Sequence, residues 1–174
     1  MANPENVNSS EMLDSQQESQ EQLANQKFDE IFNKIYGNQP SNAMSENGLA
    51  IQKDGDIKWE LWAFNNPNIW LQKITISWFW ANGNEPSNYT LKRENWKFEL
   101  ETTVWEGGVK KNVIDNITPE ELLNNFLPKF EKRLNEWEEL KKQQRQKAIE
   151  DANQYAYQQD QQDADRLLQE NWLA

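Results

Sequence analysis

The sequence predicts an α+β domain: a four-stranded antiparallel meander packed on a long C-terminal helix, with a short N-terminal helix and polar, partly disordered tails. Residues 57–117 hold seven of the nine Trp residues and alternate apolar and polar side chains with a period of two. An apolar stripe at helical spacing follows over residues 122–140. The flanking regions, 1–22 and 141–174, are rich in Gln, Asn, Glu and Asp. These observations predict a compact Trp-rich unit over 23–140, preceded by a polar tail over 1–22 and followed by an acidic, Gln-rich helical extension over 141–174.

The N-terminal region divides at about residue 22. Residues 1–22 contain scarcely any apolar side chain, so they are expected to form a disordered polar tail. A short amphipathic helix is predicted over 23–36, because Phe28, Ile31, Phe32 and Ile35 recur at helical spacing and Gly37 suits a left-handed C-cap. The segment from there to Gly55 is expected to be a polar linker.

The first hairpin is predicted from its side-chain chemistry. If residues 65–68 form a four-residue loop, Glu60 faces Lys73 as an ion pair, Trp62 faces Leu71, and Phe64 faces Ile69. The opposite face is then the core face, and its members are Ile57, Trp59, Leu61, Ile74, Ile76, Trp78 and Trp80.

Two more strands complete the expected meander. A looser connection over 82–88 leads to a third strand, whose inward side chains are Trp96, Phe98, Leu100, Thr102 and Val104. The pair Gly107-Gly108 supplies the positive φ angles of a tight hairpin, which predicts a short fourth strand over 109–114.

The long helix has a strong start signal. Thr118 is an N-cap residue, Pro119 occupies the first helical position, and Glu121 stands at the capping-box position. A kink is expected at Pro128. The helix should bury Phe126, Phe130, Leu134 and Trp137 against a sheet face made of Trp59, Ile74, Ile76, Trp78, Trp96 and Phe98. Most of the Trp residues, Trp70 included, are therefore expected in the core.

Composition excludes several kinds of chemistry. The chain has no Cys and no His, so it has no disulfides, thiolate nucleophile, imidazole base or Cys/His metal site. Glu94, Glu99, Glu101 and Glu106 are expected to be solvated charges, and no phosphate loop or EF-hand pattern is present. We therefore expect no enzyme activity, cofactor or metal.

Charge and hydropathy constrain the partners. The net charge is -11, and the basic side chains of the sheet are balanced by acidic ones, so direct nucleic-acid binding is not expected. No secretion signal is apparent near the start, and no apolar run approaches the roughly 20 residues that span a bilayer. The expected compartment is the cytoplasm, without membrane attachment.

Two groups of apolar side chains are candidate partner-binding residues. The first group consists of Trp62 and Phe64 on the outward face, together with Trp105, which is expected to stack with Lys110 across the final hairpin. The N-terminal helix is the alternative cover for the outward patch. The second group lies at the C-terminal end and consists of Leu167, Leu168, Trp172 and Leu173, which bind either a partner or the chain's own domain.

These patterns support two hypotheses about function. The first is a non-enzymatic cytoplasmic protein that binds another protein, as an adaptor, assembly factor or inhibitor. One variant is an acidic mimic of nucleic acid encoded by a phage or mobile element. The alternative is a small-ligand or carbohydrate-binding module that uses outward-facing aromatic rings. An enzyme that uses two carboxylates or a lysine is a third, weaker hypothesis.

Overall fold

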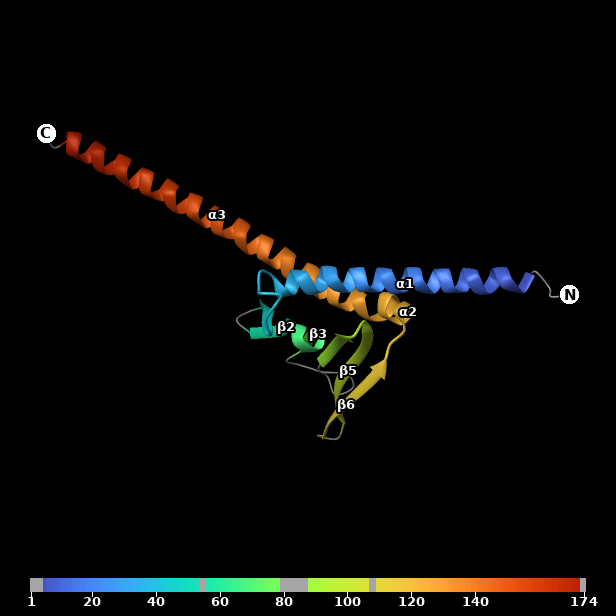
Figure 1. The fold of residues 1–174 in the computed structure, drawn as a ribbon. Helices are drawn as coiled ribbons and strands as arrows, with labels where there is room; N and C mark the ends of the chain where they lie inside the picture. Colours follow the sequence, from blue (N-terminus) through green and yellow to red (C-terminus); the bar gives the residue numbers. More distant parts are fainter. Residues whose placement is uncertain (1–4, 54–55, 79–87, 107–108, 173–174) are drawn as a thin grey trace. The chain divides into compact units, whose positions relative to one another are not determined.

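The α+β architecture is confirmed, but the sheet has six strands instead of four (Figure 1). The computed structural model describes residues 5–53, 56–78, 88–106 and 109–172, and it describes side chains over 15–51, 58–77, 88–103 and 114–172. Strands β1 to β6 follow one another in an antiparallel meander. Their bounds are β1 Ser45–Lys53, β2 Asp56–Asn66, β3 Leu71–Trp78, β4 Asn88–Glu94, β5 Lys97–Glu106 and β6 Val109–Asn116.

The two additional strands are β1 and β4. The segment that forms β1 was expected to be a polar linker, and β4, which follows the loose connection over 82–88, was not predicted. Both strands carry few large apolar residues, because only one face of each packs against a core. In β4, for example, Leu91 and Arg93 are buried, while Thr90 and Lys92 on the other face are partly exposed.

The first hairpin has the predicted faces but a different register. Glu60 pairs with Ser77, four residues beyond the predicted partner Lys73. The shift arises because residues 67–69 form a 3-10 turn, which moves the connection toward the C-terminus. An even shift leaves every side chain on its original face. Trp59 and Leu61 therefore still lie beside Ile76 on the core face.

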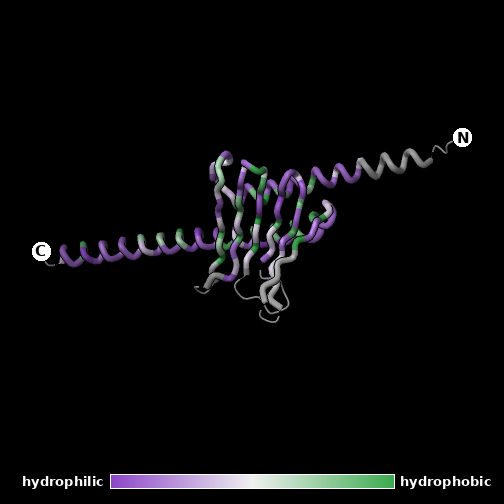
Figure 2. The backbone as a smooth tube through the Cα atoms, turned by 60° about the horizontal axis from the view of Figure 1, so that its bottom comes forward, coloured by the Kyte–Doolittle hydropathy of each residue, from purple (hydrophilic) through white to green (hydrophobic). Residues whose placement is uncertain are grey.

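The helices of the first unit cover this core face (Figure 2). Helix α1 buries Phe28, Ile31, Phe32 and Ile35, and the Phe28 ring meets the Phe98 ring edge-on at a centroid distance of 5.4 Å. The other helical layer buries Leu122, Leu127, Phe130 and Leu134. Of the predicted core, Trp59, Ile74, Ile76, Phe98, Phe130 and Leu134 are buried and Phe126 is half-buried.

Two Trp residues are exceptions, because Trp70 and Trp96 were expected in the core and are mostly exposed. Both lie in turns beyond the strand ends, where the alternation of faces no longer applies. The expected positions of the Trp78 side chain and of Trp80, and the expected φ angles of Gly107 and Gly108, fall outside what the structure describes. The pair that flanks the two glycines, Glu106 and Val109, has the predicted register.

Helix α1 is longer than the sequence predicts. It runs from Glu5 to Tyr36 instead of beginning near Leu23, and Gly37 ends it with φ 65° as expected for a C-cap. Lys27 Nζ lies 2.8 Å from Glu131 Oε1, which joins the two helical layers. This hydrogen bond and the charge of Glu131 raise the pKa of Lys27.

The second helical layer begins with the predicted capping box. Thr118 Oγ1 accepts a hydrogen bond from Glu121 N–H, and Glu121 Oε2 accepts one from Thr118 N–H. The second bond lowers the pKa of the Glu121 carboxyl. Helix α2 (Pro119–Glu121) continues as a π-helical turn, η2 (Leu122–Phe126), and then as α3 (Leu127–Trp172). The wider π turn precedes Pro128, which has no N–H and crowds the preceding turn.

The chain divides into two compact units, Met1–Asn135 and Glu136–Ala174. In the second unit, which we call the helical extension, side chains are described over residues 136–172. Those from Lys142 to Trp172 are all exposed. Hydrogen bonds between residues four apart support the helix itself, such as those from Gln146 to Glu150 and from Gln159 to Tyr155.

The open face of the sheet carries Trp62 above a glycine. A β-carbon at Gly48 would lie 2.7 Å from Cε3 of the Trp62 ring, and the indole Nε1 donates a hydrogen bond to Glu60 Oε2 over 2.9 Å. Trp62 therefore lies across β1 because position 48 has no side chain. The outward patch is not covered by α1, which packs on the opposite face.

The Gly48→Ala substitution is expected to displace the Trp62 indole and to destabilise the first unit by about 1–3 kcal/mol, the usual range for overpacking. The measurement is a double-mutant cycle with Trp62→Ala, in which chemical denaturation gives the free energy of unfolding of each variant. Once the indole is absent, Gly48→Ala should be neutral or stabilising, because alanine restricts the unfolded chain more than glycine does. Equal effects in both backgrounds would contradict the observed contact.

Candidate functional site

A polar row crosses the core face at one end of the sheet. The register aligns Ser45 with Asn65 and Gln72 with Arg93, and it also pairs Asn65 with Gln72. Asn65 and Arg93 are only 6% and 7% exposed, whereas Ala63, Ile74 and Leu91 in the adjacent row of the same face are apolar and fully buried. Burial of polar side chains is costly unless they are hydrogen-bonded, so this row indicates a specific role.

Arg93 is the centre of the row. Its Nη1 donates to Asn25 Oδ1 over 3.0 Å, and its Nη2 donates to Asp29 Oδ1 over 2.5 Å and to Gln72 Oε1. The guanidinium carbon lies 4.4 Å from the Phe28 ring centroid and 5.4 Å from that of Trp96. The Asp29 carboxylate offsets the positive charge, so Arg93 acts here as a fixed, planar hydrogen-bonding group.

Asn65 is held on the other side of the row. Its Nδ2 donates to the Ser41 carbonyl over 3.0 Å, which ties β2 to the segment between α1 and β1. Because Gln72 Oε1 accepts from Arg93, the Gln72 amide also has a fixed orientation. The row therefore presents amide groups whose positions are set before any ligand arrives.

Two turns at the same end of the sheet carry Trp residues in unusual backbone conformations. Trp70 ends the 3-10 turn η1 (Pro67–Ile69) with φ 51°, and Asn95 and Trp96 form a two-residue turn with φ 50° and 66°. Asn-Gly is the preferred sequence for such a turn, so Trp96 stands where glycine is favoured. A bulky residue with positive φ is uncommon and costs about 1 kcal/mol or more.

The two turns are joined, and their indoles are open to solvent. Asn95 N–H donates to the Trp70 carbonyl over 3.4 Å. The side chains of Trp70 and Trp96 are 71% and 64% exposed. Strained backbone that holds exposed aromatic rings contributes little to folding, and it is typical of functional sites.

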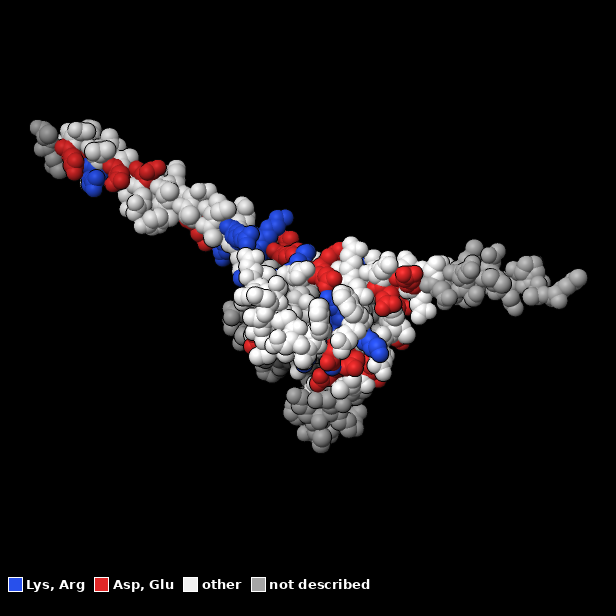
Figure 3. All heavy atoms as spheres, in the orientation of Figure 1, with Lys and Arg blue, Asp and Glu red and all other residues white. Residues whose placement is uncertain are grey.

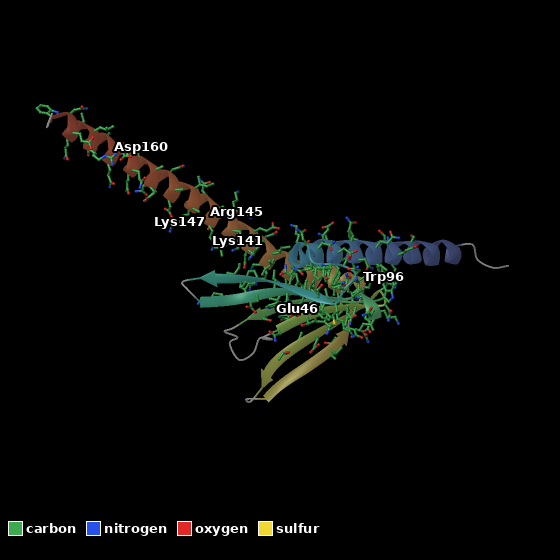
Figure 4. The ribbon with its side chains drawn as sticks, turned by 60° about the vertical axis from the view of Figure 1, so that its left-hand side comes forward. Glu46, Trp96, Lys141, Arg145, Lys147 and Asp160 are labelled. Carbon is green, nitrogen blue, oxygen red and sulfur yellow. The ribbon has the colours of Figure 1, made fainter. Side chains whose placement is uncertain are left out.

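The indoles and the polar row enclose a cavity of about 480 Å³, which we call the hairpin-end pocket. Its size falls within the range of small-ligand sites, which combine aromatic walls with a few oriented polar groups. Figure 4 shows Trp96 where the sheet end meets α1. The lining residues are Asp29, Ser41, Asn65, Pro67, Trp70, Gln72, Arg93 and Trp96.

A second hollow lies along α1 beside Trp96 and measures about 680 Å³. It is a groove on one helix face, and Glu18, Glu21 and Glu30 on its border are all exposed. Although this groove is larger, the hairpin-end pocket is the better candidate, because its walls come from several elements and its polar groups are buried. The neighbouring carboxylates repel anions from the pocket entrance.

The structure places the predicted partner-binding residues elsewhere. Trp62 is 39% exposed on the open sheet face, and Phe64 beside it is half-buried with Lys73 Nζ 5.9 Å from its ring centroid. Trp105 pairs with Lys110 as predicted, but its side chain lies outside the described residues, as does that of Leu173. Leu167, Leu168 and Trp172 are exposed on the helical extension.

Sequence reasoning missed Trp70 and Trp96 as site residues because it assigned large aromatics to the core. Turn chemistry was the available signal. Glu94 and Lys97 are paired residues of opposite charge that flank Asn95-Trp96, and Asn at the first position of a two-residue loop favours positive φ. The signal at Trp70 was weaker, although Asn66 and Pro67 together favour a turn.

Two of the carboxylates singled out in the sequence, Glu94 and Glu99, form ion pairs on the open sheet face. Lys92 Nζ lies 2.6 Å from Glu94 Oε2 and 3.2 Å from Glu99 Oε2, and the hydrogen bond to Glu94 raises the pKa of Lys92. Among the described residues, no cluster of three or more acidic side chains is arranged to hold a metal ion. No helix among the described residues is both long enough and apolar enough to cross a membrane.

Comparisons with protein-family models, curated proteins and solved structures give no match to this chain.

Proposed function

We propose that the chain is a non-enzymatic binding protein whose hairpin-end pocket holds a neutral sugar unit of an oligosaccharide. The observation that carries this proposal is the pair of exposed indoles, Trp70 and Trp96, held at positive φ beside buried polar side chains. A sugar ring has an apolar C–H face and a hydroxyl edge. An indole face suits the first, and oriented amides and a guanidinium suit the second.

Electrostatics favour a neutral ligand. The charge of Arg93 is offset by Asp29 at an Nη2 to Oδ1 distance of 2.5 Å, so the pocket has no strong field for an anion. The acidic groove along α1 and the net charge of -11 disfavour sulfated sugars, phosphate esters and nucleic acids. A ligand with many hydroxyls and no charge remains compatible with both features.

The proposal is tested with four neutral hexasaccharides: cellohexaose, xylohexaose, chitohexaose and maltohexaose. Isothermal titration calorimetry on the full chain should detect binding of at least one of them with a micromolar to millimolar Kd. The Trp70→Ala variant should bind that sugar about tenfold to a hundredfold more weakly, while Trp62→Ala, which removes an indole from the open sheet face, should bind it as the wild type does. If none of the four sugars binds at millimolar concentration, the sugar assignment is wrong.

Protein binding through the helical extension is the second candidate function. It is favoured by the exposure of Leu167, Leu168 and Trp172. These apolar side chains provide hydrophobic stabilisation only when another surface covers them and removes them from water. An adaptor, assembly factor or inhibitor of cytoplasmic location would use the extension in this way.

Deletion of residues 163–174 is expected to leave the melting temperature of the first unit within experimental error of the full chain. The reason is that the described side chains of this segment are all exposed, so their loss removes no buried surface. The measurement combines calorimetric melting with a binding assay for association. A large fall in melting temperature with unchanged association would show that the segment belongs to the fold.

A further inference from the structure

The helical extension displays large apolar side chains along an exposed helix. Among its described side chains, all those from Lys142 to Trp172 are exposed. Single exposed apolar residues are ordinary, and the large ones here point to several sides of the helix, so they do not form one continuous patch. The large ones are Ile149, Tyr155, Tyr157, Leu167, Leu168 and Trp172.

One face of this helix is divided by chemistry into three parts. Positions three or four residues apart lie on the same side of an α-helix. Between residues 142 and 163, this face shows two basic side chains, then three apolar ones, then two acidic ones. These are Lys142 and Arg145, then Ile149, Ala152 and Ala156, then Asp160 and Asp163.

The separation of charge extends to the neighbouring positions. Residues 141–149 hold four basic side chains and no acidic one. Beyond residue 150 the only basic side chain is Arg166. Figure 3 shows the basic group and the more distal acidic groups on the extension, and Figure 4 labels Arg145 and Asp160 on the same helix.

The pattern is self-complementary about a point between Ala152 and Asn153. Lys142 and Asp163 are equally far from that point, and so are Arg145 and Asp160, and Ile149 and Ala156. We propose that this face pairs with the same face of a second copy of the chain, with the two helices antiparallel. Each basic pair then lies level with an acidic pair, and the apolar segments meet at the centre.

Charge selects this occupant and this direction. A parallel arrangement would place Lys142 beside Lys142 and Asp163 beside Asp163, so like charges would repel. The small side chains of Ala152 and Ala156 allow two helices to approach closely at the centre. Because the apolar area is modest and the outer pairs are ionic, the dimer should be reversible and weakened by salt.

The test uses the full chain and sedimentation equilibrium. The wild type should dimerise reversibly, and its Kd should rise with salt concentration. Arg145→Glu should raise that Kd about tenfold or more, because it sets like charges against each other at both ends. Lys147→Glu is the matched control, since residue 147 projects from the opposite side of the helix and makes the same charge change. It should dimerise nearly as the wild type does.

Charge exchange supplies the decisive experiment. Lys142→Glu with Arg145→Glu makes both ends of the face acidic, and Asp160→Lys with Asp163→Lys makes both ends basic. Each variant alone should be monomeric, and an equimolar mixture should form a heterodimer. Circular dichroism should confirm that both variants keep their helix content, so that loss of self-association does not reflect unfolding.

Three results would overturn the proposal. A wild type that stays monomeric at all accessible concentrations shows that the face does not pair with itself. Dimers that persist equally in both exchanged variants place the interface elsewhere on the chain. Failure of the mixture to form heterodimers, with both helices intact, excludes the proposed alignment of charges.

Discussion

Trp70→Ala and Trp96→Ala are each expected to lower the affinity for the bound hexasaccharide by about tenfold to a hundredfold. A Trp at the centre of a binding site commonly contributes about 2 kcal/mol or more, and each 1.4 kcal/mol is tenfold in Kd. The measurement is titration calorimetry on the purified variants. Both indoles are mostly exposed and line the hairpin-end pocket, so binding should fall without a matching loss of folding stability.

Two further variants separate binding from structure. Trp96→Gly restores the residue type that the two-residue turn favours, so it should relieve about 1 kcal/mol of backbone strain while still abolishing the ring contact. Trp62→Ala removes an indole of similar size from the open sheet face and should leave affinity unchanged. If Trp62→Ala lost affinity and Trp70→Ala did not, the sugar would bind on the open face of the sheet and not in the hairpin-end pocket.

Phe28→Ala is expected to destabilise the first unit by about 3–5 kcal/mol, the usual cost of removing a buried large aromatic. The Phe28 ring is fully buried and contacts the rings of Phe32 and Phe98 and the guanidinium of Arg93. Chemical denaturation followed by near-ultraviolet circular dichroism measures the change. The melting temperature should fall by about 10 °C, because 1 kcal/mol corresponds to roughly 2–4 °C at this size.

Leu23→Ala is the matched control on the same helix. Leu23 is nearly half exposed, so its truncation should change stability by less than about 0.5 kcal/mol. Equal effects of the two substitutions would contradict the packing of α1 on the core face. If Phe28→Ala changed the free energy of unfolding little and Trp96→Ala changed it greatly, Trp96 would belong to the core, as predicted from the sequence.

The core face could be predicted from the sequence because side-chain alternation survives errors of register. Trp59, Ile74 and Ile76 lie on the predicted face although the hairpin register differs by four residues. The capping box at Thr118 and Glu121 could also be predicted, since it depends on local chemistry alone. Edge strand β1 could not, because it offers few apolar side chains and resembles a polar linker.

The candidate site was less accessible to sequence reasoning. Arg93 lies close to Trp96 in sequence, but its partners Asn25, Asp29 and Gln72 come from distant segments that only the fold brings together. Trp96 was assigned to the core on the basis of its size, whereas its position in a two-residue turn determines its exposure. The expectation of a carbohydrate-binding module named the outward-facing rings, and neither Trp62 nor Trp105 is among the residues that line the hairpin-end pocket.

The most direct test of the central claim is a titration of the chain labelled with ¹⁵N at its Trp indoles. Each Trp indole N–H gives its own resonance, which is assigned by single Trp→Phe substitutions. The four neutral hexasaccharides serve as titrants. The hairpin-end pocket predicts that the Trp70 and Trp96 resonances shift together and saturate with one Kd, while those of Trp59 and Trp62 stay in place. Shifts at Trp62 alone, or no shift at Trp70 and Trp96 with any of the four sugars, would contradict it.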